Sequence, residues 1–158
     1  MSVAELAAGS DLCALVTVTG DTVKEDPSGD VRTFIHYRVK VDRPVFGKGP
    51  SEFEIRIPAV KHEGGAVPFP GSPGFSPGSS WVVFLKNVEA RAGTYDLIST
   101  GQGAIRVVVR STGDGPVAIV KSDTPGEARP AAVLVQLPDL IAQIEAVRSN
   151  LEQEEGGR

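Results

Sequence analysis

Residues 64–85 decide the fold, and they read Gly-Gly-Ala-Val-Pro-Phe-Pro-Gly-Ser-Pro-Gly-Phe-Ser-Pro-Gly-Ser-Ser-Trp-Val-Val-Phe-Leu. The first part is dense in Gly and Pro, which disfavour helices and ladder strands because Pro lacks an N–H and Gly costs backbone entropy. The second part, Trp81 to Leu85, is the most apolar run of the chain and has the length of a strand buried on both faces. We therefore expect a long irregular loop over residues 60–79 that leads into a central strand.

The composition is that of a globular protein built from short strands. The chain has 158 residues, enough for one domain that buries roughly 68–70% of its unfolded surface. Its 18 Gly and 12 Pro indicate frequent turns, which suit many short strands better than a helix bundle. A net charge of -4 argues against a partner chosen by overall charge, such as duplex nucleic acid or an anionic membrane.

Cysteine content and hydropathy exclude several kinds of site. The single cysteine, Cys13, excludes an internal disulfide and a multi-cysteine metal site, and its apolar neighbours predict a small buried residue. We expect neither a metal nor a cofactor. No segment approaches the roughly 20 apolar residues of a membrane span. The stretch after Met1 lacks the basic start and apolar core of an export signal, so either the protein stays in the cytoplasm or Met1 is not its native start.

Two-residue alternation predicts antiparallel strands around the central one. A first strand over 12–19 is followed by a turn at 26–30, Asp-Pro-Ser-Gly-Asp, which makes a hairpin with a second strand over 31–41. That second strand has the clearest alternation. We expect its first face to lie in the core and its second in solvent; the two sets are Val31, Thr33, Ile35, Tyr37, Val39 and Val41, and Arg32, Phe34, His36, Arg38, Lys40 and Asp42.

Further short strands and one helix complete the prediction. Strands are expected near 53–57, 81–85, 95–98, 104–110 and 117–120, with Ile105, Val107 and Val109 facing inward. Pro138-Asp139 opens the only helix that the sequence predicts. Its apolar stripe is Leu140, Ile141, Ile144, Val147 and Leu151.

These elements predict a mainly β domain over residues 1–158. It divides into a β-barrel over 11–121, a crossing segment over 122–137, a C-terminal amphipathic helix over 138–153 and a polar tail over 154–158. Six or seven short antiparallel strands indicate a small barrel or a sandwich. A five-stranded Greek-key barrel of the OB type is our first choice.

Several short patterns resemble known bacterial proteins. They are Ser10-Asp-Leu12, Val39-Lys-Val41, Val45-Phe-Gly47, Pro70-Gly-Ser-Pro-Gly-Phe75, Pro77-Gly78, Val82-Val-Phe-Leu85 and Gly101-Gln-Gly103. Together they look like a group of uncharacterised exported bacterial β-barrel proteins. More distantly, the first two strands and the Phe-Gly pair resemble the OB-type domain of netrin-like modules and tissue metalloprotease inhibitors. The resemblance implies the fold and an extracytoplasmic address, but no activity. The inhibitors' N-terminal zinc-binding cysteine has no counterpart, because Cys13 is internal and alone.

The motifs that carry chemistry have plainer explanations. Gly74-Phe-Ser-Pro-Gly78 matches the G-x-S-x-G pattern of serine hydrolases, but Pro77 has no N–H for an oxyanion and a strand follows instead of a helix. His62-Glu63 lacks the second histidine of a zinc-binding helix. We predict no catalytic residue and no metal ligand, and an enzyme is the function with least support.

The sequence therefore favours a non-catalytic binding module with an unidentified protein or small ligand. The loop 60–79 is too long to be a mere connection, and we expect His62, Glu63, Phe69 and Phe75 to form its binding site, with the two rings exposed or clamped.

Two other functions remain open. An OB barrel can bind single-stranded nucleic acid on the face that carries Arg32, Phe34, His36, Arg38 and Lys40. The simpler interpretation pairs those basic residues with Glu52 and Glu54 on the next strand. The third function is a protease-inhibitor-like domain.

Overall fold

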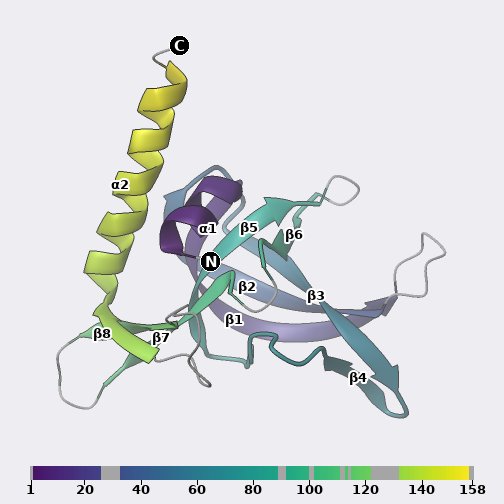
Figure 1. Cartoon of the computed structure of the whole chain (residues 1–158). Coiled ribbons are helices and arrows are strands. Elements are labelled where there is room, and N and C mark those ends of the chain that lie inside the picture. Colours follow the sequence, from purple (N-terminus) through teal and green to yellow (C-terminus); the bar gives the residue numbers. More distant parts are fainter. Residues whose placement is uncertain are drawn as a thin grey trace, which may run out of the picture.

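The structure, a computed structural model, describes residues 2–25, 33–88, 92–99, 102–110, 113, 115–121 and 132–156. It is mainly β, with one helix at each end of the described chain (Figure 1). The prediction of a mainly β protein with a C-terminal helix is confirmed. In chain order the elements are α1 (Val3–Gly9), β1 (Leu12–Glu25), β2 (Thr33–Phe46), β3 (Glu52–His62), β4 (Gly65–Pro68), β5 (Ser80–Asn87), β6 (Thr94–Leu97), β7 (Ala104–Val109), β8 (Pro116–Lys121), β9 (Ala132–Gln136) and α2 (Leu137–Gly156).

Five of the strands close into a ring. Their order is β1-β2-β3-β6-β5, and β5 pairs again with β1. β3 and β6 run parallel, with Glu54 opposite Thr94, whereas the other pairs of the ring are antiparallel. β5 also pairs with β7, from which β8 and β9 extend the sheet away from the ring. The predicted central strand therefore joins the ring to the extension.

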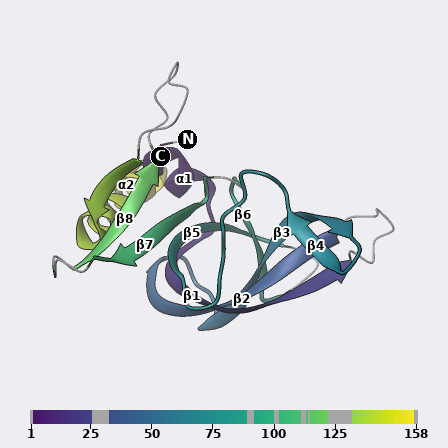
Figure 2. The same ribbon diagram turned by 90° about the horizontal axis from the view of Figure 1, so that it is seen from below.

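The core lies on both faces of β5. Trp81, Val83 and Leu85 belong to a cluster inside the ring, together with Ile55 and Val39. Val82 and Phe84 point to the opposite face and belong to a second cluster, which α1 and α2 cover (Figures 1 and 2). Residues 81–85 are all buried. The expectation of a strand buried on both faces is confirmed.

The predicted hairpin between the first two strands is longer than expected. β1 continues to Glu25, which pairs with Thr33 at the start of β2, and β2 continues to Phe46. The predicted turn at 26–30, with Val31 and Arg32, lies outside the described residues. On β2 the expected core residues Thr33, Ile35, Tyr37 and Val39 are buried, and Val41 is partly buried; on β3 Phe53, Ile55 and Ile57 are buried.

The prediction that residues 60–79 contain no ladder strand is wrong. β4 pairs antiparallel with β3, with Val60 opposite Val67. Gly64 and Gly65 allow the turn because both have positive φ, +88° and +152°. Phe69 N–H donates to the Pro58 carbonyl oxygen, so the nitrogen of Pro68 points away from β3, where no N–H is needed.

Predictions at the two ends of the chain also need correction. α1 was not expected; Ser2 caps it by accepting a hydrogen bond from the Glu5 N–H. Residues 132–136 of the predicted crossing segment form β9, while 122–131 lie outside the described residues.

The C-terminal helix and one strand end also differ from the prediction. α2 runs from Leu137 to Gly156, so it includes part of the predicted tail. Leu140, Ile141 and Ile144 of its predicted stripe are buried against the second cluster. Val109 was expected to face the core but is 79% exposed, because β7 ends there opposite Pro116, beyond that cluster.

Candidate interaction surface

Three large apolar side chains are exposed together on the β3–β4 hairpin. Val60, Val67 and Phe69 are 51%, 50% and 47% exposed. Val60 and Val67 are cross-strand partners, and the hydrogen bond from Phe69 to Pro58 places Phe69 two positions further along the same face. We call Val60, Val67 and Phe69 the hairpin face. Of the predicted site residues, Phe69 is therefore on the surface, among apolar neighbours that we did not predict.

His62 and Glu63 lie at the turn of the same hairpin, and both are exposed. His62 Nδ1 lies 2.8 Å from the Glu63 carbonyl oxygen, to which it donates a hydrogen bond as the protonated nitrogen. The hydrogen bond fixes the imidazole next to the turn. Within the described ranges no group of three or more His, Cys, Asp or Glu side chains could hold a metal ion. The turn therefore offers a polar rim to the hairpin face.

Phe75 lies inside the ring and not beside Phe69. It is 6% exposed and packs edge-on against Tyr37 and Trp81, with ring centroids 5.1 Å and 5.0 Å away. Hydrogen bonds hold the following residues too: Gly78 N–H donates to the Val18 carbonyl oxygen at 2.8 Å. Of the two states that we expected for this ring, exposed or clamped, it is clamped. The ring therefore belongs to the core cluster and is not part of the hairpin face.

The outward face of β2 is not a solvated row of side chains. Phe34 and His36, expected in solvent, are 8% and 2% exposed. The Arg56 guanidinium lies 4.6 Å from the centroid of the Phe34 ring and covers it. Arg38 and Lys40 are exposed as expected, and Arg32 lies outside the described residues. Strand alternation alone does not reveal a neighbour's long side chain that folds over the outer face.

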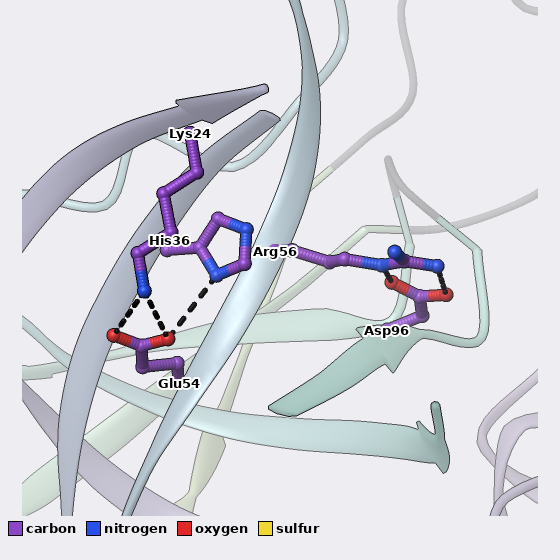
Figure 3. A network of polar contacts seen from close by, with 5 residues as sticks. All are labelled: Lys24, His36, Glu54, Arg56 and Asp96. Carbon is purple, nitrogen blue, oxygen red and sulfur yellow. Dashed lines mark hydrogen bonds and ion pairs between the residues drawn. The ribbon is translucent and has the colours of Figure 1, made fainter. Parts of the chain in front are cut away.

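The carboxylate of Glu54 on β3 binds two basic side chains, those of Lys24 and His36 (Figure 3). Glu54 accepts hydrogen bonds from Lys24 Nζ, at 3.2 and 3.3 Å, and from His36 Nδ1 at 3.2 Å. Arg56 points the other way and binds Asp96 through two bonds of 2.6 and 3.1 Å. The expected pairing of a basic residue of β2 with Glu54 is confirmed for His36.

The same contacts set the pKa of Glu54. Partial burial alone would raise it, but the hydrogen bonds from Lys24 and His36, and then the charges of these two groups, more than offset that effect. The net result is a pKa below that of a free glutamate. This carboxylate is therefore charged at neutral pH, where it holds Lys24 and His36 in place.

A sequence signal for the hairpin face did exist. The two-residue turn Glu63-Gly64 joins β3 to β4, with His62 opposite Gly65, and a glycine at the second turn position is typical of a β-hairpin. The high proline content of the following residues obscured it. The burial of Phe75 had no comparable signal, because it depends on the ring closing around it.

Comparisons of the chain with protein-family models, with curated proteins and with solved structures found no match. Within the described residues, neither helix has the combination of length and apolar character that crossing a membrane requires.

Proposed function

We propose that this protein is a non-catalytic interaction module that binds a protein partner through the hairpin face. The observation that carries the proposal is the clustering of Val60, Val67 and Phe69, each about half exposed, on two paired strands and the residue that directly follows them. Contiguous exposed apolar side chains with a polar rim are typical of protein interaction sites. The hairpin also projects at the end of the molecule opposite α2, where a partner can reach it (Figures 1 and 2).

The geometry favours a protein over a small ligand. Small-molecule sites are concave and enclose most of the ligand. The hairpin face instead lies on the open side of a two-stranded segment, and its rim carries the exposed residues His62 and Glu63. A surface of this kind can be covered by an apolar patch of another protein.

We also propose that the ring is a small barrel of the OB type. Its strand order supports this: with β4 left out, the third strand of the ring pairs in parallel with the fifth, and the fourth pairs with the first. A Greek-key barrel of five strands requires such a crossing. In this arrangement Val67 and Phe69 of the hairpin face and the Phe75 anchor belong to the long connection between the third and fourth strands, while Val60 lies on the third strand itself.

Three immobilised baits test the interaction. The wild type and a Val67→Ser/Phe69→Ser variant are exposed to extract of the source organism, and Val109→Ser is the matched control, because Val109 is exposed but lies on β7. We expect a protein that is retained by the wild type and the control and lost with the double variant. Equal retention by all three baits would refute the hairpin face. Deleting residues 66–75 is not a clean test, because it also removes the buried ring of Phe75.

The nucleic-acid alternative has less support. A stacking platform needs accessible rings, whereas Phe34 is covered by Arg56 and His36 is held by Glu54. Passing the wild type over immobilised single-stranded DNA at low salt checks this alternative. A panel of metalloproteases does the same for inhibitor activity.

A further inference from the structure

Within the described part of the chain, β9 forms one end of the sheet and lacks three of the features that protect edge strands, namely proline, charge and a bulge. Among the described residues it pairs only with β8. Its sequence, Ala-Val-Leu-Val-Gln, contains no proline and no charge, and its pairing shows no register shift. Natural edge strands are commonly protected by one of these devices. β4 shows the contrast, because Pro68 removes a donor from its free edge.

The exposure of two apolar side chains on β9 indicates which kind of element could cover this edge. Val133 and Leu134 are 51% and 50% exposed. They are consecutive, so their side chains lie on opposite faces of the sheet. Val133 is opposite Val120 on the face that α2 covers, and Leu134 is opposite Ile119 on the other face. A helix or a ligand on one face would cover only one of the two residues. A further strand along the edge would cover both.

We propose that the missing strand is β9 of a second copy, which pairs antiparallel with the first around a two-fold axis at Leu134. In this register Leu134 meets its own copy, Val133 meets Val135, and Ala132 meets Gln136. Each face of one sheet continues into the same face of the other, so both helices α2 lie on the same side. β9 contains no charged residue, so no like charges meet across this pairing. The strand is therefore complementary to itself, as a two-fold interface requires.

The surface area that the two β9 strands would bury sets the expected stability of the dimer. Stable interfaces bury about 1,200 Å² or more in total, and a pair of five-residue strands offers less than that. We therefore expect a dimer whose population rises with protein concentration. This inference does not depend on the hairpin face, which lies at the opposite end of the molecule (Figure 1).

Sedimentation velocity over a concentration series tests the proposal on the full chain. We expect the wild type to change from monomer to dimer as its concentration rises. Leu134→Lys and Leu134→Glu each place like charges directly opposite one another, and each should raise the dissociation constant by about fivefold. Mixing the two variants should restore a dimer, because opposite charges then face each other. Val109→Lys, on an exposed residue away from the edge, should dimerise as the wild type does.

Several results would overturn the proposal. A wild type that stays monomeric at all concentrations would do so, and so would dimers that survive in both Leu134 variants or fail to return in their mixture. Loss of the dimer in Phe69→Ser would place the contact on the hairpin face and would equally refute it. Far-UV circular dichroism establishes that each variant is folded. If either Leu134 variant is not, amide hydrogen exchange of the wild type decides: the amides of β9 whose N–H groups point away from β8 must exchange more slowly at high concentration, and unchanged rates would refute the dimer.

Discussion

The ring of Phe75 stands perpendicular to that of Trp81, with centroids 5.0 Å apart and an interplanar angle of 90°. This contact joins the proline-rich connection to the central strand, and the second edge-on contact, from Phe75 to Tyr37, joins it to β2. Edge-to-face pairs of this kind contribute about 0.5–1.5 kcal/mol beyond the burial of their area. One part of the connection is therefore fixed inside the ring, while the hairpin before it presents Phe69 to solvent.

The two phenylalanines of this connection should respond very differently to truncation. We expect Phe75→Ala to lower the free energy of unfolding by about 3–5 kcal/mol, because it empties a packed site between two rings. Phe69→Ala should change it by less than about 1 kcal/mol, since the side chain is half exposed. Urea unfolding followed by Trp81 fluorescence measures both. Similar losses in the two variants would contradict the placement of Phe75.

The lowered pKa of Glu54 predicts how stability depends on pH. A carboxyl whose pKa is lower in the folded state stabilises the fold above its unfolded pKa, about 4.3, and loses that contribution as the pH falls through the lower folded value. We expect the wild type to lose stability on acidification from about pH 5 downwards. At pH 7, Glu54→Gln should be less stable than the wild type by about 1–2 kcal/mol, and the difference should shrink in acid.

Glu52→Gln is the matched control for this effect. Glu52 lies on the same strand and the same face, but it is exposed. It should leave the stability and its pH dependence nearly unchanged. Free energies of unfolding from urea titrations between pH 3 and 8 compare the three proteins. A Glu54→Gln variant that loses as much stability in acid as the wild type would contradict the role of this carboxylate.

Gly47 should tolerate no side chain. It follows β2 with φ at +84°, and a Cβ there would overlap the backbone carbonyl oxygen of Asp11. We expect Gly47→Ala to cost more than about 2 kcal/mol, because the strained conformation and the overlap add. Gly71 has a similar φ of +86° but open space around it, so Gly71→Ala should cost only about 1 kcal/mol. Thermal unfolding of both variants separates the two effects, and equal losses would rule out the close approach.

Cys13 should be unreactive in the folded protein. Its side chain is buried, and burial raises its pKa, so almost no thiolate forms at neutral pH. We expect labelling by a thiol reagent to proceed only as fast as the protein opens, and to become complete in denaturant. Because the chain has a single cysteine, mass spectrometry reads this directly. Rapid labelling under native conditions would show that β1 is accessible.

The sequence predicted those elements whose local pattern and tertiary environment agree. Alternation located β2 and β3, and the apolar run at Trp81 located a strand buried on both faces. α1 has only seven residues, too few for a clear stripe, although Ser2 and Glu5 give the spacing of a capping box. β9 is short and uncharged, and its sequence alone only weakly indicates a strand. It forms a strand because it pairs with β8.

The candidate site was only partly predictable for a similar reason. His62, Glu63 and Phe69 are on the surface because they lie on or beside the projecting β3–β4 hairpin. The glycine at its turn indicates this hairpin in the sequence. Phe75 follows the same kind of proline-rich pattern as Phe69, yet it turns inward because the closed ring offers a place between Tyr37 and Trp81. Phe34 is hidden by Arg56, a residue from another strand. Alternation reports which face a residue takes but not what covers that face.

Photo-crosslinking from the hairpin tests the proposed function most directly. A photoreactive phenylalanine analogue is placed at residue 69 or, as a control, at the exposed residue 109, and each protein is irradiated in extract of the source organism. We predict a discrete adduct from position 69 that is absent from position 109 and that unlabelled wild-type protein, but not the Val67→Ser/Phe69→Ser variant, competes away. No adduct at position 69, or the same adduct from both positions, would contradict it.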